Sequence, residues 1–157
     1  MVIGVSKRES SNNYCSLVLS QSCLALSWDQ AEREIIKLAQ KINFSVDLIV
    51  GIARGGLVPA TIISRVLNIE EIHSLKMRRI NGKRELLTHL DNDLNGKKVL
   101  LIDDMSESGG TLLHAQQYLE SKGAIVKTAC LYSLATNSSS PDYFLKTIPE
   151  LIQFPWD

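Results

Sequence analysis

Two adjacent carboxylates, Asp103 and Asp104, follow the apolar run Val99–Ile102 and precede a short loop of small and hydroxyl residues. The apolar run predicts a buried strand, and ligands bind at the carboxyl ends of strands in an open α/β sheet. The loop opens a helix, so its free backbone N–H groups could bind a phosphate. The carboxylates beside it could accept hydrogen bonds from sugar hydroxyls. The segment therefore predicts a site for a phosphorylated ribose.

A second glycine-containing loop follows an earlier apolar strand. The strand is expected over Val46–Ile52 and leads into Ala53-Arg54-Gly55-Gly56. A helix is then expected over about 57–67, with Pro59 tolerated in its first turn. Two strand ends thus carry loops of the kind that bind ligands.

Strands and helices alternate along the rest of the chain. Ser27 and Gln30 form a capping box that starts a helix, and Trp28 lies on its apolar stripe, which predicts a core position for this ring. Further strands are expected at 72–77, 98–102 and 125–132, and a helix is expected from the loop after Asp104 to about residue 122. The alternation predicts an α/β fold, a mainly parallel twisted sheet with helices on both faces.

Three segments do not fit the alternation. Residues 1–26 are expected to be an N-terminal extension of unknown role, and residues 27–157 to be the domain. The polar segment Arg78–Asn95 is expected to be a long mobile loop. From Thr136 a turn-rich linker leads to short strands at 143–145 and 151–152, which predicts a small hood over one end of the sheet at 136–157.

Composition excludes several classes of function. The 17 basic and 17 acidic residues cancel, which leaves no broad electrostatic basis for binding nucleic acid or a membrane surface. No apolar run approaches the ~18 residues that cross a bilayer. The three cysteines lack a metal-binding spacing and favour free thiols in a reducing compartment, so a cytoplasmic location is expected.

Two motifs and the closing residues together resemble the type I phosphoribosyltransferases. Residues 103–111 are similar to the signature that binds phosphoribosyl pyrophosphate (PRPP), and residues 51–60 are similar to the pyrophosphate loop of the xanthine/guanine and hypoxanthine branch. Phe154-Pro155-Trp156-Asp157 is similar to the end of the short bacterial and archaeal members. The resemblance covers about Ser27–Asp157. It implies the family's fold, purine salvage, and a dimer or tetramer of identical chains.

The implied reaction transfers ribose 5-phosphate from PRPP to hypoxanthine, guanine or xanthine and releases pyrophosphate. The resemblance assigns Asp103 and Asp104 to the ribose hydroxyls, directly or through Mg²⁺, which shares a few protein oxygens with waters and substrate phosphates. It assigns the 5′-phosphate to the backbone and hydroxyls of Glu107, Ser108, Gly109, Gly110 and Thr111.

For the pyrophosphate, the resemblance implies Arg54, Gly55, Gly56 and, as a weaker candidate, Lys76. It also implies that the Ala53–Arg54 peptide is cis. The basic residues between 78 and 84 are either a solvated face of a loop or a lid that closes on pyrophosphate.

The base half of the site departs from the family pattern. Glu107 replaces the aspartate that handles the proton near the base N7, which makes Glu107 the candidate catalytic residue with an added methylene. The lysine that contacts the 6-oxo group is missing where Ser133 and Leu134 stand. Leu151 replaces the aromatic residue that stacks on the base, and Ile152 would form a second side of the base pocket. Two alternatives stay open, transfer to a different base and a non-catalytic regulatory module that binds PRPP or a nucleotide.

Overall fold

The computed structural model describes residues 24–157, and its central sheet is parallel except at one edge. The strand order is β4-β3-β2-β5-β7-β6, β8 also pairs with β7, and only β4 runs antiparallel to its neighbour. The predicted extension lies, up to residue 23, outside the described residues. The strands are β2 (Leu48–Ala53), β3 (Ile72–Ile80), β4 (Lys83–Leu86), β5 (Lys98–Ile102), β6 (Met105–Ser106), β7 (Ile125–Leu134) and β8 (Tyr143–Ile148).

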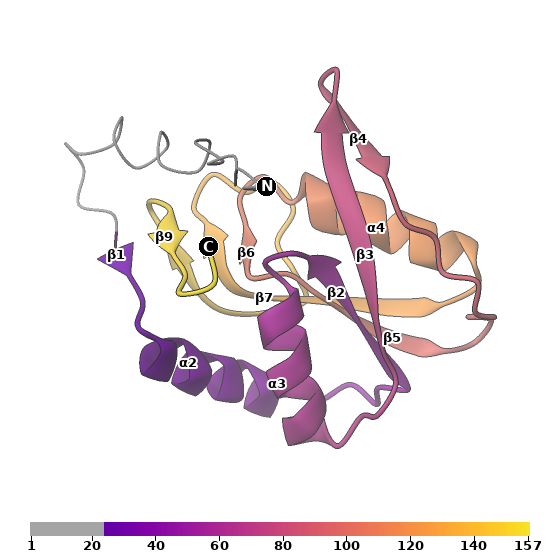
Figure 1. Ribbon diagram of the computed structural model, residues 1–157, viewed down its shortest axis with the longest axis horizontal. Helices are drawn as coiled ribbons and strands as arrows, with labels where there is room; N and C mark the ends of the chain where they lie inside the picture. Colours follow the sequence, from indigo (N-terminus) through magenta and orange to yellow (C-terminus); the bar gives the residue numbers. More distant parts are fainter. Residues whose placement is uncertain (1–23) are drawn as a thin grey trace, which may run out of the picture.

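Helices cover both faces of this sheet, as predicted. Helices α2 (Trp28–Lys41) and α3 (Leu57–Leu67) lie together, and α4 (Gly110–Ser121) lies on the opposite face (Figure 1). The strand residues alternate between the two cores because successive side chains point to opposite faces. In β5, Leu100 and Ile102 pack with α2 and α3, whereas Val99 and Leu101 pack with α4. No described helix is long and apolar enough to cross a membrane.

The predicted core position of Trp28 is wrong. The capping box between Ser27 and Gln30 forms as expected, but the Trp28 side chain is 57% exposed. Trp28 is the first residue of α2, and its ring contacts Trp156 at a centroid distance of 5.9 Å. The helix therefore buries its stripe from Ala31 onward and leaves its first aromatic ring at the surface.

The predicted mobile loop at 78–95 is also wrong in its first half, which is a β-hairpin. Strand β3 continues to Ile80, turns at Asn81-Gly82 and returns as β4. Both turn residues have positive φ, 49° and 78°, and Asn-Gly is the pair that favours a two-residue turn of this kind. The signal is present in the sequence, but charged side chains at most other positions hide it.

The predicted hood consists of two different structures. Strand β8 extends the central sheet beside β7. Strand β9 (Ile152–Gln153) instead pairs with β1 (Leu24–Ala25) in a separate two-stranded sheet. The chain from β9 to Asp157 then packs over the edge of the core through Phe154 and Trp156.

Asp142 ties the start of β8 to β7. Its Oδ2 accepts hydrogen bonds from the Thr128 backbone N–H (2.8 Å) and hydroxyl (3.0 Å), and its Oδ1 accepts one from Lys127 Nζ at 2.6 Å. Burial alone would raise the pKa of this carboxyl, but the bonds from Lys127 and Thr128 outweigh it, so the pKa lies below its usual value.

Asp142→Asn is expected to lower the free energy of unfolding at pH 7 by about 1–2 kcal/mol, because the charged acceptor is lost. A pKa lowered by folding stabilises the native state above the unfolded value of about 3.9 and ceases to do so as the pH falls through the folded value. Urea denaturation at pH 7 and pH 3 should therefore show a difference from the parent that shrinks at pH 3. Glu150→Gln, at an exposed position, is the control.

Candidate active site

The two glycine-containing loops leave the same edge of the sheet and pack against each other. Strands β2 and β5 are parallel neighbours, with Gly51 paired with Ile102, the last residue of β5. Strand β2 continues to Ala53, so the chain leaves both strands at the same edge of the sheet. A Cβ on Gly55 would overlap the Asp104 carboxylate, and a Cβ on Gly56 would overlap the Ile102 carbonyl oxygen. Only glycine lets the backbone approach this closely.

The two carboxylates are held in defined orientations. Asp103 Oδ1 accepts a hydrogen bond from the Asp104 backbone N–H at 3.0 Å. Asp104 Oδ1 accepts one from the Met105 backbone N–H at 2.7 Å, and its Oδ2 accepts one from Trp156 Nε1 at 3.0 Å. Both carboxylates thus leave β5 with their side chains fixed by backbone groups and one indole.

Burial raises the pKa of both carboxyls. The pKa of Asp103 lies well above its usual range because its burial is compounded by the neighbouring Asp104 charge. The pKa of Asp104 is raised by burial and partly lowered by the Trp156 hydrogen bond. Within residues 24–157, no lysine, arginine or histidine forms an ion pair with either group. The two carboxylates therefore lie side by side without a direct ion-pair partner among the described side chains.

A cavity of about 100 Å³ lies at the N-terminus of α4. Gly109 precedes the helix with a φ of 77°, and no described side chain caps the first turn. The first N–H groups of a helix lack partners inside it and attract an anion. The cavity's lining contains the predicted 5′-phosphate residues Glu107, Ser108, Gly109 and Thr111, together with Asp103.

Arg84 reaches this cavity from the hairpin. Its Nη2 donates to Ser108 Oγ at 3.0 Å and its Nε donates to Thr111 Oγ1 at 3.3 Å. The guanidinium also leaves no room for a Cβ on Gly110. The sequence placed Arg84 only in a basic segment. If the hairpin had been predicted from the Asn81-Gly82 turn, the alternation of side chains along the next strand would have placed Arg84 on the face toward α4.

A second cavity, of about 340 Å³, adjoins the first. It shares Arg84, Asp103, Glu107 and Thr111 with the first cavity, so these four residues stand between the two. Arg79 also lines it and lies directly opposite Arg84 in the hairpin. Arg78 lines it as well, so three arginines and the helix N-terminus give the cavities a positive side, and Asp103 and Glu107 give them a negative side.

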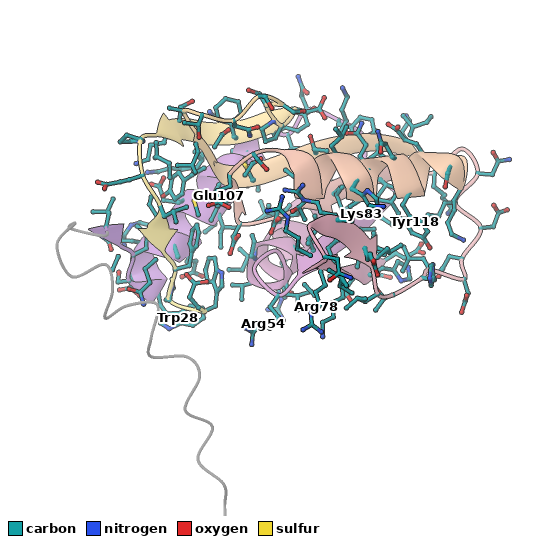
Figure 2. The ribbon with its side chains drawn as sticks, turned by 90° about the horizontal axis from the view of Figure 1, so that it is seen from above. Trp28, Arg54, Arg78, Lys83, Glu107 and Tyr118 are labelled. Carbon is teal, nitrogen blue, oxygen red and sulfur yellow. The ribbon has the colours of Figure 1, made fainter. Side chains whose placement is uncertain are left out.

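The remaining predicted pyrophosphate residues lie at the ends of β2 and β3. The Ala53–Arg54 peptide is cis, as the resemblance implies. Arg54 is exposed, and Figure 2 shows it at the edge of the molecule. Lys76 is exposed and paired with Ala53 across the two strands. Neither side chain lines the two cavities described above.

The four predicted base-binding residues lie in different environments. Ser133 is 2% exposed, and its hydroxyl accepts a hydrogen bond from Asn137 Nδ2 at 3.0 Å. Leu134 is half-buried and Ile152 is buried in the core, whereas Leu151 is 46% exposed. Asn137 Nδ2 also donates to Ser106 Oγ at 2.8 Å, so this amide links the Asp103–Thr111 loop to β7.

Comparison with known proteins gives one consistent family. The profile of the phosphoribosyl transferase domain matches residues 26–157. A xanthine-guanine phosphoribosyltransferase of Chromohalobacter salexigens is 29% identical over 139 residues, which cover 84% of this chain and 82% of that protein. The crystal structure of a purine phosphoribosyltransferase from Pyrococcus horikoshii superposes with a TM-score of 0.81 at 33% identity, over 87% of this chain and 95% of that chain. A ribose-phosphate pyrophosphokinase of Thermoplasma acidophilum is 30% identical, over 77% of this chain but only 42% of that protein.

Proposed function

The chain belongs to the family of phosphoribosyl transferase domains, and from this we propose that it transfers ribose 5-phosphate from PRPP to hypoxanthine, guanine or xanthine. A base nitrogen forms a bond to C1 of the ribose as the bond from C1 to the pyrophosphate oxygen breaks. The observation that carries the proposal is the packing of the Gly55-Gly56 loop against Asp104, beside the cavity at the start of α4. This packing supports the proposal, because it brings the loop assigned to the leaving group, the carboxylates assigned to the ribose and the helix start assigned to the 5′-phosphate to one edge of the sheet.

Different residues of the chain bind the 5′-phosphate, the ribose and the pyrophosphate of PRPP. The N–H groups of the α4 N-terminus, with Ser108, Thr111 and Arg84, bind the 5′-phosphate. Asp103 faces both cavities and accepts the ribose hydroxyls. The pyrophosphate lies toward the loop of Arg54, Gly55 and Gly56, with Lys76 at the neighbouring strand end and Arg79 in the larger cavity.

The paired carboxylates fit a Mg²⁺ ion shared with the substrate. No three described His, Cys, Asp or Glu side chains cluster as a metal site, so the protein alone offers two adjacent carboxylates. Mg²⁺ is commonly bound by one or two carboxylates together with substrate phosphates and waters. Asp103 and Asp104 would hold it, and a cation there would stabilise the charged form of both half-buried carboxyls, which their raised pKa disfavours. When bound, it would neutralise charge on the substrate.

The proposal is tested with a panel of acceptor bases. The protein is mixed with Mg²⁺ and PRPP, and release of pyrophosphate is followed with hypoxanthine, guanine, xanthine, adenine, a pyrimidine base or no base. Release with the 6-oxopurines supports the proposal. Release only with another base identifies a different acceptor, which the buried Ser133 in place of a lysine favours as the second candidate. PRPP binding without release would instead indicate a regulatory module.

Glu107→Gln is expected to slow transfer about 100-fold, with little change in PRPP affinity. Glu107 is exposed, lines both cavities, and lies beside the start of α4 (Figure 2). Loss of a group that moves a proton in the transition state costs about 10²–10⁴-fold. Single-turnover kinetics and PRPP calorimetry separate the two effects. A parental rate of transfer would exclude Glu107 as the proton-handling group.

Arg84→Gln is expected to weaken PRPP binding about tenfold or more, because a charged hydrogen-bond donor to phosphate is lost. Lys83→Gln is the matched control, since Lys83 is the exposed neighbour in β4. Calorimetric titration with Mg²⁺ and PRPP measures both variants. Equal losses in the two variants would mean that only the general charge of the hairpin matters.

We also propose that the protein is a homo-oligomer, a dimer or tetramer, located in the cytoplasm. Leu57 and Val66 are exposed apolar side chains on α3, and association of identical chains would cover such surface. Sedimentation velocity gives the number of chains.

A further inference from the structure

The Asp104 carboxylate has one partner that comes from a distant part of the chain. Trp156 is 52 residues away and donates its indole N–H to Oδ2 at 3.0 Å. The other oxygen is held locally, by the Met105 backbone N–H. Without Trp156, one backbone bond alone would fix the direction of the side chain, and the carboxylate could rotate about it. The orientation of Asp104 against Gly55 therefore depends on Trp156.

Trp156 is itself fixed by a column of aromatic rings. Its ring stacks on Phe154 with a centroid distance of 4.9 Å and an interplanar angle of 10°, and Phe154 stacks on Tyr132 at 6.0 Å and 16°. Tyr132 and Phe154 are almost fully buried, and Tyr132 is paired with Met105 across β6 and β7. The column thus connects the sheet beneath the Asp103–Thr111 loop to Trp156, the residue that holds Asp104.

The chemistry of the donor matters as much as its position. An indole N–H is a neutral donor, so it orients the carboxylate without supplying a positive charge. A lysine or arginine at this place would neutralise Asp104 and compete with a substrate-bound cation. Trp156 orients the group and leaves its charge available to the ligand.

We propose that Trp156 is a positioning residue for PRPP: its indole N–H fixes the Asp104 carboxylate against the Gly55-Gly56 loop and so couples the segment after β9 to the ribose end of the site. The inference rests on the proposed function, because it requires that PRPP binds beside Asp104. It gives the closing residues a role in substrate binding in addition to packing.

A fluorescence experiment tests the coupling without removing the residue. The chain has two tryptophans, and Trp28 touches the Trp156 ring without any described polar bond to the site. In Trp28→Phe, the emission reports Trp156 alone. Addition of PRPP with Mg²⁺ is expected to change this emission, with the midpoint that calorimetry gives for binding. This variant should keep the parental affinity. An emission that stays constant through saturation would count against the inference.

A double-mutant cycle tests whether Trp156 acts through Asp104. Trp156→Phe keeps an aromatic ring on Phe154 but lacks the N–H donor, and is expected to weaken PRPP binding about tenfold, the usual effect of a lost hydrogen bond to a charged group. In an Asp104→Ala background, which leaves no oxygen to accept the indole N–H, the same change should weaken binding less than about twofold, since coupled residues are not additive.

The outcomes distinguish the positioning role of Trp156 from the proposed transfer activity. Equal fold losses in both backgrounds would show that Trp156 only stabilises the structure and would overturn the positioning role, while PRPP binding by the parent would leave the proposed function intact. Failure of the parent to bind PRPP at all would overturn both. Circular dichroism and thermal unfolding identify a variant that does not fold. In that case the emission of the Trp28→Phe variant decides whether Trp156 is coupled to PRPP binding.

Discussion

Gly56→Ala is expected to lower the free energy of unfolding by about 3 kcal/mol or more, and to abolish PRPP binding in the fraction that still folds. Gly56, the N-cap of α3, is buried against the ends of β2 and β5, and its added Cβ would overlap the Ile102 carbonyl oxygen and the backbone of Ile52. These are backbone atoms of two central strands and cannot rotate away. Urea denaturation gives the stability, and calorimetry gives the PRPP affinity.

Gly82→Ala is the control, because it measures the cost of backbone conformation without any steric overlap. Gly82 has a φ of 78°, and apart from its two chain neighbours no atom of residues 24–157 lies within 4 Å of an added Cβ. Only the left-handed conformation is penalised there, at about 1–2 kcal/mol. If Gly56→Ala cost no more than Gly82→Ala, the two loops would not be packed as closely as the structure shows.

Asp103→Asn is expected to affect ligand binding and stability in opposite directions. PRPP affinity should fall about 100-fold or more, because a charged acceptor for the ribose and its cation is lost. Stability without ligand should rise by about 1 kcal/mol, as in other variants that relieve a strained functional site. The reason is that the unliganded protein holds two adjacent, half-buried carboxylates without an ion-pair partner in its described part. Asparagine keeps an oxygen that can accept the bond from the Asp104 N–H.

Asp91→Asn removes the same charge at an exposed position and should change neither property. Thermal unfolding and calorimetry measure both variants with and without Mg²⁺ and PRPP. A loss of stability in Asp103→Asn would mean that the Asp103 charge is compensated in the free protein.

The order of the central elements was predictable because local pattern and tertiary structure agree there. Four apolar residues before Asp103 give a buried strand, glycines mark the loops, and alternation gives helices on both faces. The neighbouring placement of the two loops follows from parallel pairing of β2 and β5. The Asp103–Thr111 segment lies at the start of α4, as its sequence indicates.

The remaining parts depend on contacts between residues far apart in sequence. Arg84 bonds to Ser108 and Thr111, which lie 24 and 27 residues away, and Trp156 bonds to Asp104. No local periodicity reports such pairs. Strand β8 joins the sheet because Asp142 and the edge of β7 provide partners, which a Pro-containing tail does not suggest. The hairpin is a different case, since Asn81-Gly82 did carry the signal.

The hairpin that carries Arg79 and Arg84 also has a thermodynamic consequence. Like charges directly opposite each other on an antiparallel pair repel, and β4 is an edge strand that has one neighbour among the described strands. An anion between the two guanidinium groups removes that repulsion, so ligand binding and pairing of β4 are linked equilibria. Amide hydrogens at 78–86 should exchange faster in the free protein than in the PRPP complex, while those of β2 and β5 report only global unfolding. Substrate thereby contributes to the folding of the strand that helps to bind it.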